Sequence, residues 1–522
     1  MTELRPYPFG HLVRRALQEL EHEQKLFDLP IAHGFFGDEQ LDLSVRMHGQ
    51  RASSPLGPAA GPHTQMAQNI ALSWMAGCRV MELKTVQVND RLEIARPCID
   101  MQTVGYNIEW SQELRIQESL EEYVKASMLL EILKESQLLP LTSNFGETLF
   151  DLSLGYDLKG IRHPTVQAFI DSMGDASAVI DRLRKEIPVE LASYRDLDFN
   201  VCISNQVTLS TFHGCPPSEI ERIAEHLLEE KGLHTIVKLN PTLLGPKRLK
   251  EILHGTLGYT EANVPLDAFD EDTHWDEMAA FCERLEQLAQ RVELGFGVKF
   301  SNTLIVRNHR DFFPKSEERM YLSGAPLHVL ATTLVADFRE QFGMRFPISF
   351  SAGIDRHNFA DATAIGLVPV TTCSDLLKTG GYRRGSKYFK SLADRMHAVG
   401  ALNLGEFSIR AFGLGAQALG QLKGIDPETL QTCQTALDTG TCLRTAVGEV
   451  LFEEWVRGAQ QLGTQHYASQ VTTDPRYALA KNSKLPPKMG RDLKTFDCVA
   501  CDKCVPVCPN GANFSFRIEP CE

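Results

Sequence analysis

Short apolar runs alternate with helical stretches between about residues 50 and 395. The runs are RVMELKT, FDLSLGYD, NVCISN, HTIVKLN, LGFGVKFSNT, PISFSAGI and LVPVTTCSD. Each has the length of a buried strand and ends in small or polar residues, and each is followed by a segment long enough for a helix, such as Pro217 to Lys231 or Phe359 to Leu367. Repeated strand–helix units of this kind build a parallel sheet.

The number of runs and their polar ends favour a closed barrel over an open, doubly wound sheet. There are at least seven runs, and residues of functional type stand at their carboxyl ends, as at the active face of a (β/α)8 TIM barrel. The sequence therefore predicts an α/β fold with a barrel over residues 50–395. An amphipathic helix within residues 5–29 is expected to make residues 1–49 an N-terminal brace. Its apolar face consists of Leu12, Val13, Ala16, Leu17 and Leu20.

The alternation of strands and helices stops after about residue 395. Residues 400–465 have a mainly helical pattern, and residues 466–497 are polar and contain Pro475, Pro486 and Pro487, which indicates an extended linker. We therefore expect a helical segment and linker over residues 396–490 and a separate module over residues 491–522.

That module contains the pattern C-x2-C-x2-C-x3-C-P. The cysteines are Cys498, Cys501, Cys504 and Cys508. Their spacing is that of a ferredoxin-type [4Fe–4S] cluster, whereas zinc sites usually have two separated C-x2-C pairs. The four cysteines are the predicted metal ligands, and because such a cluster carries one electron at a time, the chain is expected to perform redox chemistry.

The role of the fourth cysteine stays open at this point. In two-cluster ferredoxins the last cysteine of such a run ligates the other cluster, and the sequence contains no second run. Either all four thiolates hold one cluster, or Cys508 serves a second cluster for which Cys521 or a partner subunit supplies further ligands.

Composition excludes several classes of protein. The 522 residues include 53 basic and 67 acidic ones, and the formal net charge of −14 argues against nonspecific binding to nucleic acid. No apolar stretch approaches the roughly 18 residues needed to span a bilayer, and the first residues contain no signal-peptide core. Thirteen cysteines, an odd number, fit a reducing cytoplasm better than a disulfide framework. We expect a cytoplasmic protein that binds neither nucleic acid nor membrane.

The strand ends predict the chemistry of the barrel. No G-x-G-x-x-G follows a first strand, which argues against a Rossmann domain for nicotinamide or FAD. The small-residue loop GPAAGPHT, alone an ordinary turn, comes first in an ordered series of strand ends. These are Lys84-Thr85, Lys238-Leu239-Asn240, Ser301-Asn302-Thr303, Ser351-Ala352-Gly353 and Thr372-Cys373-Ser374.

This series resembles the flavin site of the FMN-binding barrels of the dihydroorotate and dihydropyrimidine dehydrogenase family, over about residues 50–395. The cysteine run is similar to that of the dihydropyrimidine enzymes. The phrases GPAAGPHT-Q-x-A-Q-N-I and E-L-K-T-V-Q are similar to the N-terminal half of bacterial iron–sulfur flavoproteins described as selenate reductase subunits and linked to purine catabolism. The resemblance implies two cofactors, FMN and a [4Fe–4S] cluster.

The resemblance also implies which residues hold the flavin ring. Ala59 and Ala60 would line one face of the ring. Lys84 and Thr85 would reach its edge. Lys238 would lie near N1 and C2=O, where a fixed ammonium stabilises the reduced, anionic flavin.

The phosphate of FMN would lie at the ends of the last two strands. Gly353 and the backbone N–H groups of Cys373 and Ser374 would bind it at the carboxyl face of the barrel. The basic stretch over residues 378–385 either adds charge to this site or is a solvated loop.

Four polar residues are implied as substrate ligands. These are Asn107, Asn205, Asn302 and Thr303, and the last three would also contact the cofactor. An enzyme that reduces heterocycles needs such donors and acceptors, because an unpaired polar group in a pocket is costly.

The proton that accompanies hydride transfer comes, in the dihydropyrimidine enzymes, from a cysteine on a mobile loop. That cysteine lies three residues after an asparagine, whereas Cys215 lies ten residues after Asn205. Cys215 is nevertheless the first candidate acid and His213 the second, because both lie on the equivalent loop. Together with Lys238 they form the predicted catalytic set.

The expected activity is FMN- and [4Fe–4S]-dependent reduction or oxidation of a C=C or C=N bond in a pyrimidine- or purine-derived heterocycle. The alternatives are an electron-transfer subunit without its own organic substrate and a barrel that has lost flavin. Related enzymes carry a further redox module in the same polypeptide, and none follows the cysteine run here. We therefore expect an oligomer or complex in which a separate FAD/NAD(P)H flavoprotein subunit or a ferredoxin is the electron donor.

Overall fold

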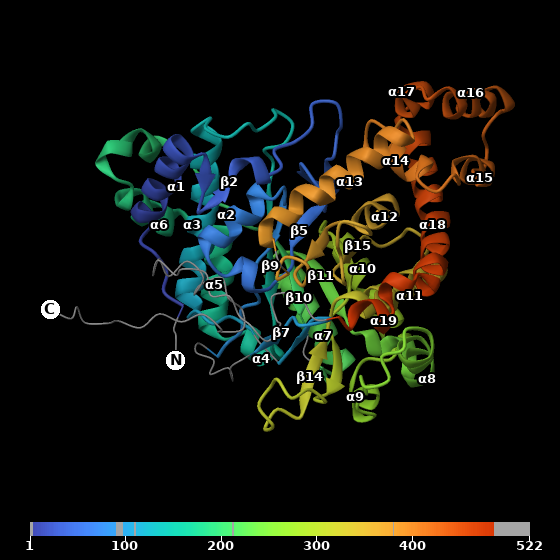
Figure 1. Cartoon of the computed structure of the whole chain (residues 1–522), viewed down its shortest axis with the longest axis horizontal. Helices are drawn as coiled ribbons and strands as arrows, with labels where there is room; N and C mark the ends of the chain where they lie inside the picture. Colours follow the sequence, from blue (N-terminus) through green and yellow to red (C-terminus); the bar gives the residue numbers. More distant parts are fainter. Residues whose placement is uncertain (1–3, 90–97, 109–110, 211–212, 379, 485–522) are drawn as a thin grey trace.

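A barrel of eight parallel strands forms the centre of the computed structural model, which describes residues 4–89, 98–108, 111–210, 213–378 and 380–484 (Figure 1). The strands are β5 (Leu56–Pro58), β6 (Val80–Glu82), β9 (Leu149–Leu154), β10 (Gln206–Ser210), β11 (His234–Leu239), β12 (Phe296–Phe300), β15 (Ile348–Phe350) and β16 (Val370–Thr372). Their order in the sheet is β5-β16-β15-β12-β11-β10-β9-β6. The prediction of an α/β TIM barrel is confirmed.

The seam between the two end strands, β5 and β6, is closed at Arg79. Its backbone N–H donates to the carbonyl of Leu56 at 2.9 Å. Its buried guanidinium donates to the carbonyls of Trp74 and Cys78 at 2.7 Å and of Phe145 at 2.8 Å. The same group lies over the rings of Trp74 and Phe145, 4.5 and 4.1 Å from their centroids. Burial lowers the pKa of Arg79 to about 9, against the opposing effect of Cys78. One arginine thus pairs buried carbonyls on both sides of the seam.

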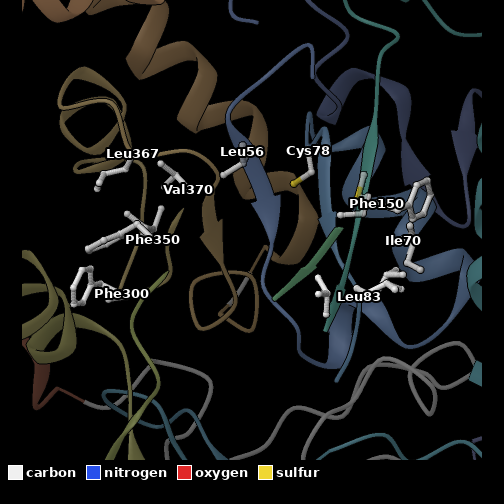
Figure 2. Packing of buried hydrophobic residues seen from close by; sticks show 14 of the residues in the cluster. Leu56, Ile70, Cys78, Leu83, Phe150, Phe300, Phe350, Leu367 and Val370 are labelled. Carbon is white, nitrogen blue, oxygen red and sulfur yellow. The ribbon is translucent and has the colours of Figure 1, made fainter. Parts of the chain in front are cut away.

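Helices cover the outside of the barrel, where the strands present apolar side chains. They include α2 (Ala67–Met75), α3 (Ile116–Glu135), α7 (Pro217–Glu225), α10 (Trp275–Arg291), α11 (Ala325–Phe342), α12 (Phe359–Ala364) and α13 (Gly385–Ala398). Figure 2 shows Leu83 and Phe150 near Ile70 of α2, and Phe300 beside Phe350 on two neighbouring strands. In the part of the chain that the structure describes, no helix is long and apolar enough to cross a membrane.

The N-terminal amphipathic helix is present as α1 (Phe9–Glu23). Its buried face contains the five apolar residues predicted from their spacing. The helix packs on α3 and on α6 (Ser177–Glu186), so that it shares one hydrophobic core with the barrel.

A small antiparallel sheet was not found from the sequence. It consists of β7 (Ile99–Asp100), β8 (Tyr106–Asn107), β13 (Leu304–Arg307) and β14 (Arg319–Leu322), in the order β13-β14-β8-β7. Two of these strands have only two residues, and all four belong to the loops that follow β6 and β12. Strands this short carry no readable alternation of apolar and polar residues.

The run NVCISN (residues 200–205) was predicted as a strand, and this is wrong. The Asn200 side chain accepts the N–H of Cys202 at 3.1 Å, and the N–H of Ile203 donates to the carbonyl of Met173 at 2.9 Å. The strand β10 occupies the next five residues, Q-V-T-L-S. Polar Thr208 turns toward Asp151 inside the barrel, which made the segment read as a loop.

The C-terminal part is helical further than predicted. It contains α14 (Leu404–Arg410), α15 (Gly415–Gln421), α16 (Pro427–Thr439), α17 (Leu443–Val447), α18 (Glu449–Thr473) and α19 (Leu479–Asn482). The long helix α18 packs on α11, and α14, α15 and α17 pack on α18 (Figure 1). The extended linker expected from residue 466 is therefore wrong up to residue 484. Tyr467 and Val471 are buried, and their packing overrides the polar composition. The predicted cluster module over residues 491–522 lies outside the described residues.

Replacing Arg79 with lysine should lower the free energy of unfolding by about 3–5 kcal/mol, because an ammonium cannot reach the same carbonyls or stack on both rings. Urea denaturation measures this change. Arg162→Lys is the matched control, since Arg162 is an exposed partner of Glu230. A loss as small as that of the control would show that the seam does not depend on the guanidinium.

Candidate functional site

A cavity lies at the carboxyl ends of the barrel strands. Every barrel strand except β9 contributes to its lining through its end or the loop that follows, and so does the small antiparallel sheet. Twelve of the predicted site residues line it. They are Ala59, Ala60, Lys84, Thr85, Asn107, His213, Lys238, Asn302, Thr303, Gly353, Cys373 and Ser374. Parallel strands bring their carboxyl ends to one face, which explains why residues so far apart in sequence meet here.

The predicted lysines lie on the floor of the cavity. Lys84 is almost fully buried, and burial, together with the charge of Lys238, lowers the pKa of Lys84 to about 8. Burial also lowers the pKa of Lys238. Lys238 is next to Lys299 in the register of β11 and β12. Three lysine side chains are therefore concentrated at this end of the barrel, and two of them line the cavity.

An ion pair inside the barrel offsets part of this positive charge. Lys299 Nζ lies 2.6 Å from Glu82 Oε2 and donates to Thr371 Oγ1 at 3.2 Å, and both members of the pair have almost no exposed side-chain surface. Burial raises the pKa of Glu82, but Lys299 and Lys238 outweigh it and hold the pKa below its ordinary value. Glu82 is therefore ionised.

A second carboxyl group beside this pair is in a different state. Asp151 is opposite Glu82 in the register of β6 and β9, and it accepts a hydrogen bond from Thr208 Oγ1 at 2.7 Å. Burial, followed by the charge of Glu82, raises the pKa of Asp151 to about 7. Sequence reasoning missed Glu82, Asp151 and Lys299. Their signal was a charged residue within an otherwise apolar strand.

The ends of β15 and β16 present unused backbone donors. Within the described chain, the N–H groups of Gly353, Cys373 and Ser374 donate to no acceptor. Gly353 has φ = +52°, and a Cβ there would come within 2.3 Å of the Gly324 carbonyl oxygen, so a side chain is excluded at this position. Adjacent N–H groups without acceptors suit a bound anion such as a phosphate.

In the basic stretch over residues 378–385, the residues that the structure describes do not line the cavity. Arg384 donates to both carboxylate oxygens of Asp375, at 2.7 Å each, and Lys378 Nζ lies 3.8 Å from the same group. The charge of Arg384 is therefore compensated by a neighbour in the loop.

The loop after β15 is tied to the C-terminal helices. His328 Nδ1 is 2.8 Å from the carbonyl of Ala352, and His328 Nε2 is 2.7 Å from Tyr467 Oη. The His328 ring stacks on Tyr477 with centroids 5.0 Å apart. Asn358 donates to the carbonyl of Gly353 at 3.0 Å and to Tyr477 Oη at 3.3 Å.

Four segments converge around His213. Its Nδ1 lies 2.9 Å from Asp272 Oδ2, its Nε2 lies 3.2 Å from the Thr303 carbonyl, and its ring stacks on Tyr321 with centroids 5.6 Å apart. Asp272 follows α9 (Asp267–Glu271), far from His213 in sequence, and no local pattern pointed to it.

Cys215 does not line the cavity, although it was the first candidate acid. The side chain is buried, with 2% of its surface exposed. Burial, reinforced by Glu219, Asp157 and Asp272, raises the pKa of Cys215 to about 12. The thiol is thus held neutral behind His213, which the structure places in the cavity instead.

The asparagines differ in their placement. Asn302 donates to Asn240 Oδ1 at 2.7 Å and Asn107 donates to the carbonyl of Ile108 at 2.9 Å, both at the cavity. Asn205 precedes β10 and thus lies at the opposite end of the barrel. There it accepts from Gln50 Nε2 at 2.6 Å, and its carbonyl accepts the N–H of His234 at 3.1 Å. The structure corrects the prediction that Asn205 is a ligand-binding residue, which followed from taking residues 200–205 as the strand.

Metal ligands are not found in the described residues, where no group of three or more His, Cys, Asp or Glu side chains could hold a metal ion. The predicted ligands Cys498, Cys501, Cys504 and Cys508 lie outside the described residues.

Comparison with known proteins identifies one family. Residues 29–412 match the profile "Oxidoreductase YgfK, N-terminal TIM-barrel domain". The chain is 40% identical over 409 residues to the "Putative oxidoreductase YgfK" of Escherichia coli strain K12 and to that of E. coli O157:H7. The match covers 74% of this chain and 39% of each relative, so the chain spans well under half the length of these relatives.

Replacing Lys299 with methionine should cost about 3–5 kcal/mol of unfolding free energy, because Glu82 is left charged and buried. The double variant Glu82→Gln/Lys299→Met should lose less than the sum of the two single variants. Denaturant unfolding of all four proteins gives the coupling, and Lys390→Met, at an exposed lysine, is the control. Additive losses would show that the two charges do not depend on each other.

The pKa of Asp151 predicts how stability changes with pH. The folded protein holds this proton more tightly than the unfolded chain, so its contribution is complete below pH 3.8 and is lost as the pH rises through about 7. Asp151→Asn should therefore raise the unfolding free energy at pH 8 by about 2–4 kcal/mol and change it little at pH 4. Asp394→Asn, at an exposed carboxylate, is the control. An equal effect at both pH values would contradict a buried, protonated Asp151.

Proposed function

The chain belongs to the family of oxidoreductase YgfK N-terminal TIM-barrel domains, and we propose on that premise that its barrel is an FMN-dependent oxidoreductase unit. The unit reduces or oxidises a C=C or C=N bond of a pyrimidine- or purine-derived heterocycle. Electrons pass between FMN and a [4Fe–4S] cluster. The proposed cluster ligands are Cys498, Cys501, Cys504 and Cys508, and they rest on sequence spacing alone.

One observation carries the proposal. The cavity contains two lysines, Lys84 and Lys238, and it also contains backbone N–H groups without acceptors at the ends of the last two barrel strands. Phosphate sites of TIM barrels usually lie at those strand ends. Lys238 faces the same cavity, where an ammonium stabilises negative charge on a bound ring. A ligand with an anionic group for the N–H donors and an electron-accepting ring for the lysines would match these two features. FMN has such a phosphate and such a ring.

The remaining lining fits a planar ring. Ala59 and Ala60 are too small to block it, and Thr85 lies at the edge of the cavity next to Lys84. Bound FMN would supply two-electron transfer to or from the substrate. The protein supplies fixed positive charge next to the ring, and the carboxylate of Glu82 offsets part of the repulsion among the lysines.

The substrate side of the cavity is polar. Asn107, Asn302 and Thr303 lie there together with Tyr321 from the small sheet. Amides and hydroxyls discriminate between heterocycles, because a substrate that lacks the matching group leaves them unpaired. This lining favours an enzyme with its own organic substrate over a barrel that only relays electrons.

The electron donor in this proposal is a separate FAD/NAD(P)H flavoprotein subunit or a ferredoxin, in an oligomer or complex. The low-potential cluster is the natural entry point for single electrons. FMN then pairs them for two-electron chemistry.

The full-length protein, purified without oxygen, should release FMN on denaturation and contain about four irons per chain. Titration with dihydrouracil, dihydroorotate, uracil and xanthine should bleach or restore the flavin absorbance with at least one of them. Release of FAD, or of no flavin after incubation with FMN, would reject the proposal that the barrel binds FMN. Flavin that responds to dithionite but to no heterocycle would favour the electron-transfer alternative.

Lys238→Met is the diagnostic variant within this experiment. It should still bind FMN, since the N–H groups at the strand ends are unchanged. Its FMN should have a lower midpoint potential, since the cation near the reduced ring is lost. Lys390→Met is the matched control. Equal loss of binding and potential would mean that Lys238 is a structural contact.

A further inference from the structure

The imidazole of His213 contacts the carboxylate of Asp272 on one side and lines the cavity, an arrangement that suits proton transfer. We propose that His213 is the group that gives the proton to the substrate, or takes it, and that Asp272 is its positioning residue. This inference rests on the proposed function. It departs from the expectation that a cysteine on the same loop does this work.

The carboxylate of Asp272 is fixed before it meets the imidazole. Its Oδ2 accepts from Thr242 Oγ1 at 2.7 Å and its Oδ1 accepts from the N–H of Gly214 at 2.8 Å. Burial raises the pKa of Asp272, but hydrogen bonds and charge from His213, with help from Thr242 and Gly214, hold it below the ordinary value. An ionised, immobile carboxylate therefore determines where Nδ1 of His213 points.

The other ring nitrogen lies at the cavity. Nε2 of His213 is 3.2 Å from the carbonyl of Thr303, a residue that itself lines the cavity. A carboxylate at one nitrogen and a carbonyl at the other are both acceptors, so the doubly protonated ring makes both hydrogen bonds. The proton on Nε2 is then held only by a neutral carbonyl, next to the space that the substrate occupies.

The surroundings of His213 contain other charged and titratable groups. Asp272 and Glu271 face its loop from the end of α9, Tyr321 stacks on the ring from β14, and Lys84 and Lys238 line the same cavity. Among the cavity-lining residues that the structure describes, His213 is the only imidazole.

Cys215 offers no comparable path. Its thiol is buried, lies outside the cavity lining, and is held neutral by a pKa of about 12. It lies two residues after His213 in sequence, which makes it a matched control on the same loop.

The proton step balances as follows when a C=C or C=N bond is reduced. The Nε2–H bond breaks, the substrate atom forms a new bond to that proton, and the neutral imidazole keeps its Nδ1–H bond to Asp272. The electron pair and the second hydrogen come from the reduced flavin of the proposed function. Water at the rim restores the proton. Oxidation of the substrate runs the same step in reverse.

The test uses the full chain loaded with FMN, in the absence of oxygen. Stopped-flow absorbance measures the rate at which dihydrouracil or dihydroorotate bleaches the flavin. His213→Gln should slow bleaching by about 10²- to 10⁴-fold and leave the dissociation constant of the probe nearly unchanged, because glutamine binds but does not titrate. Asp272→Asn should slow bleaching less and move the inflection of its pH profile to lower pH, because an imidazolium without a carboxylate neighbour gives up its proton more readily.

Cys215→Ser should match the wild type in bleaching rate and in pH profile. If His213→Gln bleaches at the wild-type rate, the inference is overturned and the proposed function stands. If Cys215→Ser is as slow as His213→Gln, the cysteine is the acid and the inference is again overturned. A wild type that binds FMN and reacts with no probe overturns the proposed function, and this inference with it. An Asp272→Asn profile that is slowed at all pH values without a shift assigns Asp272 a structural role only.

Discussion

The buried ion pair between Lys299 and Glu82 is the constraint on which the rest of the site depends. Three lysines at the carboxyl end of one barrel would repel each other strongly in a medium of low dielectric constant. A single ionised glutamate among them lowers that cost. Burial, reinforced by the charge of this glutamate, raises the pKa of the neighbouring Asp151, which then adds little further negative charge. The barrel can therefore keep Lys84 and Lys238 facing the cavity with a net positive potential while the interior below them stays close to neutral.

Much of this site was predictable because parallel strands bring their carboxyl ends together. Once the strand ends were identified, Lys84, Lys238, Asn302 and Gly353 had to share one face, whatever the loops did. The prediction failed at β10, where polar residues alternate with apolar ones, so that the strand lacks the short apolar run by which the others were identified. That single shift moved Asn205 to the wrong end of the barrel.

The unpredicted features depend on contacts between distant segments. Asp272 reaches His213 from a separate loop, and the guanidinium of Arg79 pairs carbonyls of its own segment with the carbonyl of the distant Phe145. Nothing in the local sequence of either residue distinguishes it from a surface charge. Only burial does so, and burial is a property of the assembled fold. The same reason explains why Cys215, prominent in the sequence, is not in the cavity.

The ties between the loop after β15 and the C-terminal helices have a consequence for how the unit is bounded. The match to the family profile ends at residue 412, yet Tyr467 and Tyr477 help to hold the loop that contains Ala352 and Gly353. A shorter fragment cut at the edge of the resemblance would expose His328 and Asn358 to water and release one wall of the site. The smallest unit that can be produced alone with this wall of the site intact is therefore larger than the part that matches the family profile. A barrel without these C-terminal helices would need other contacts in place of those that Tyr467 and Tyr477 make with His328 and Asn358.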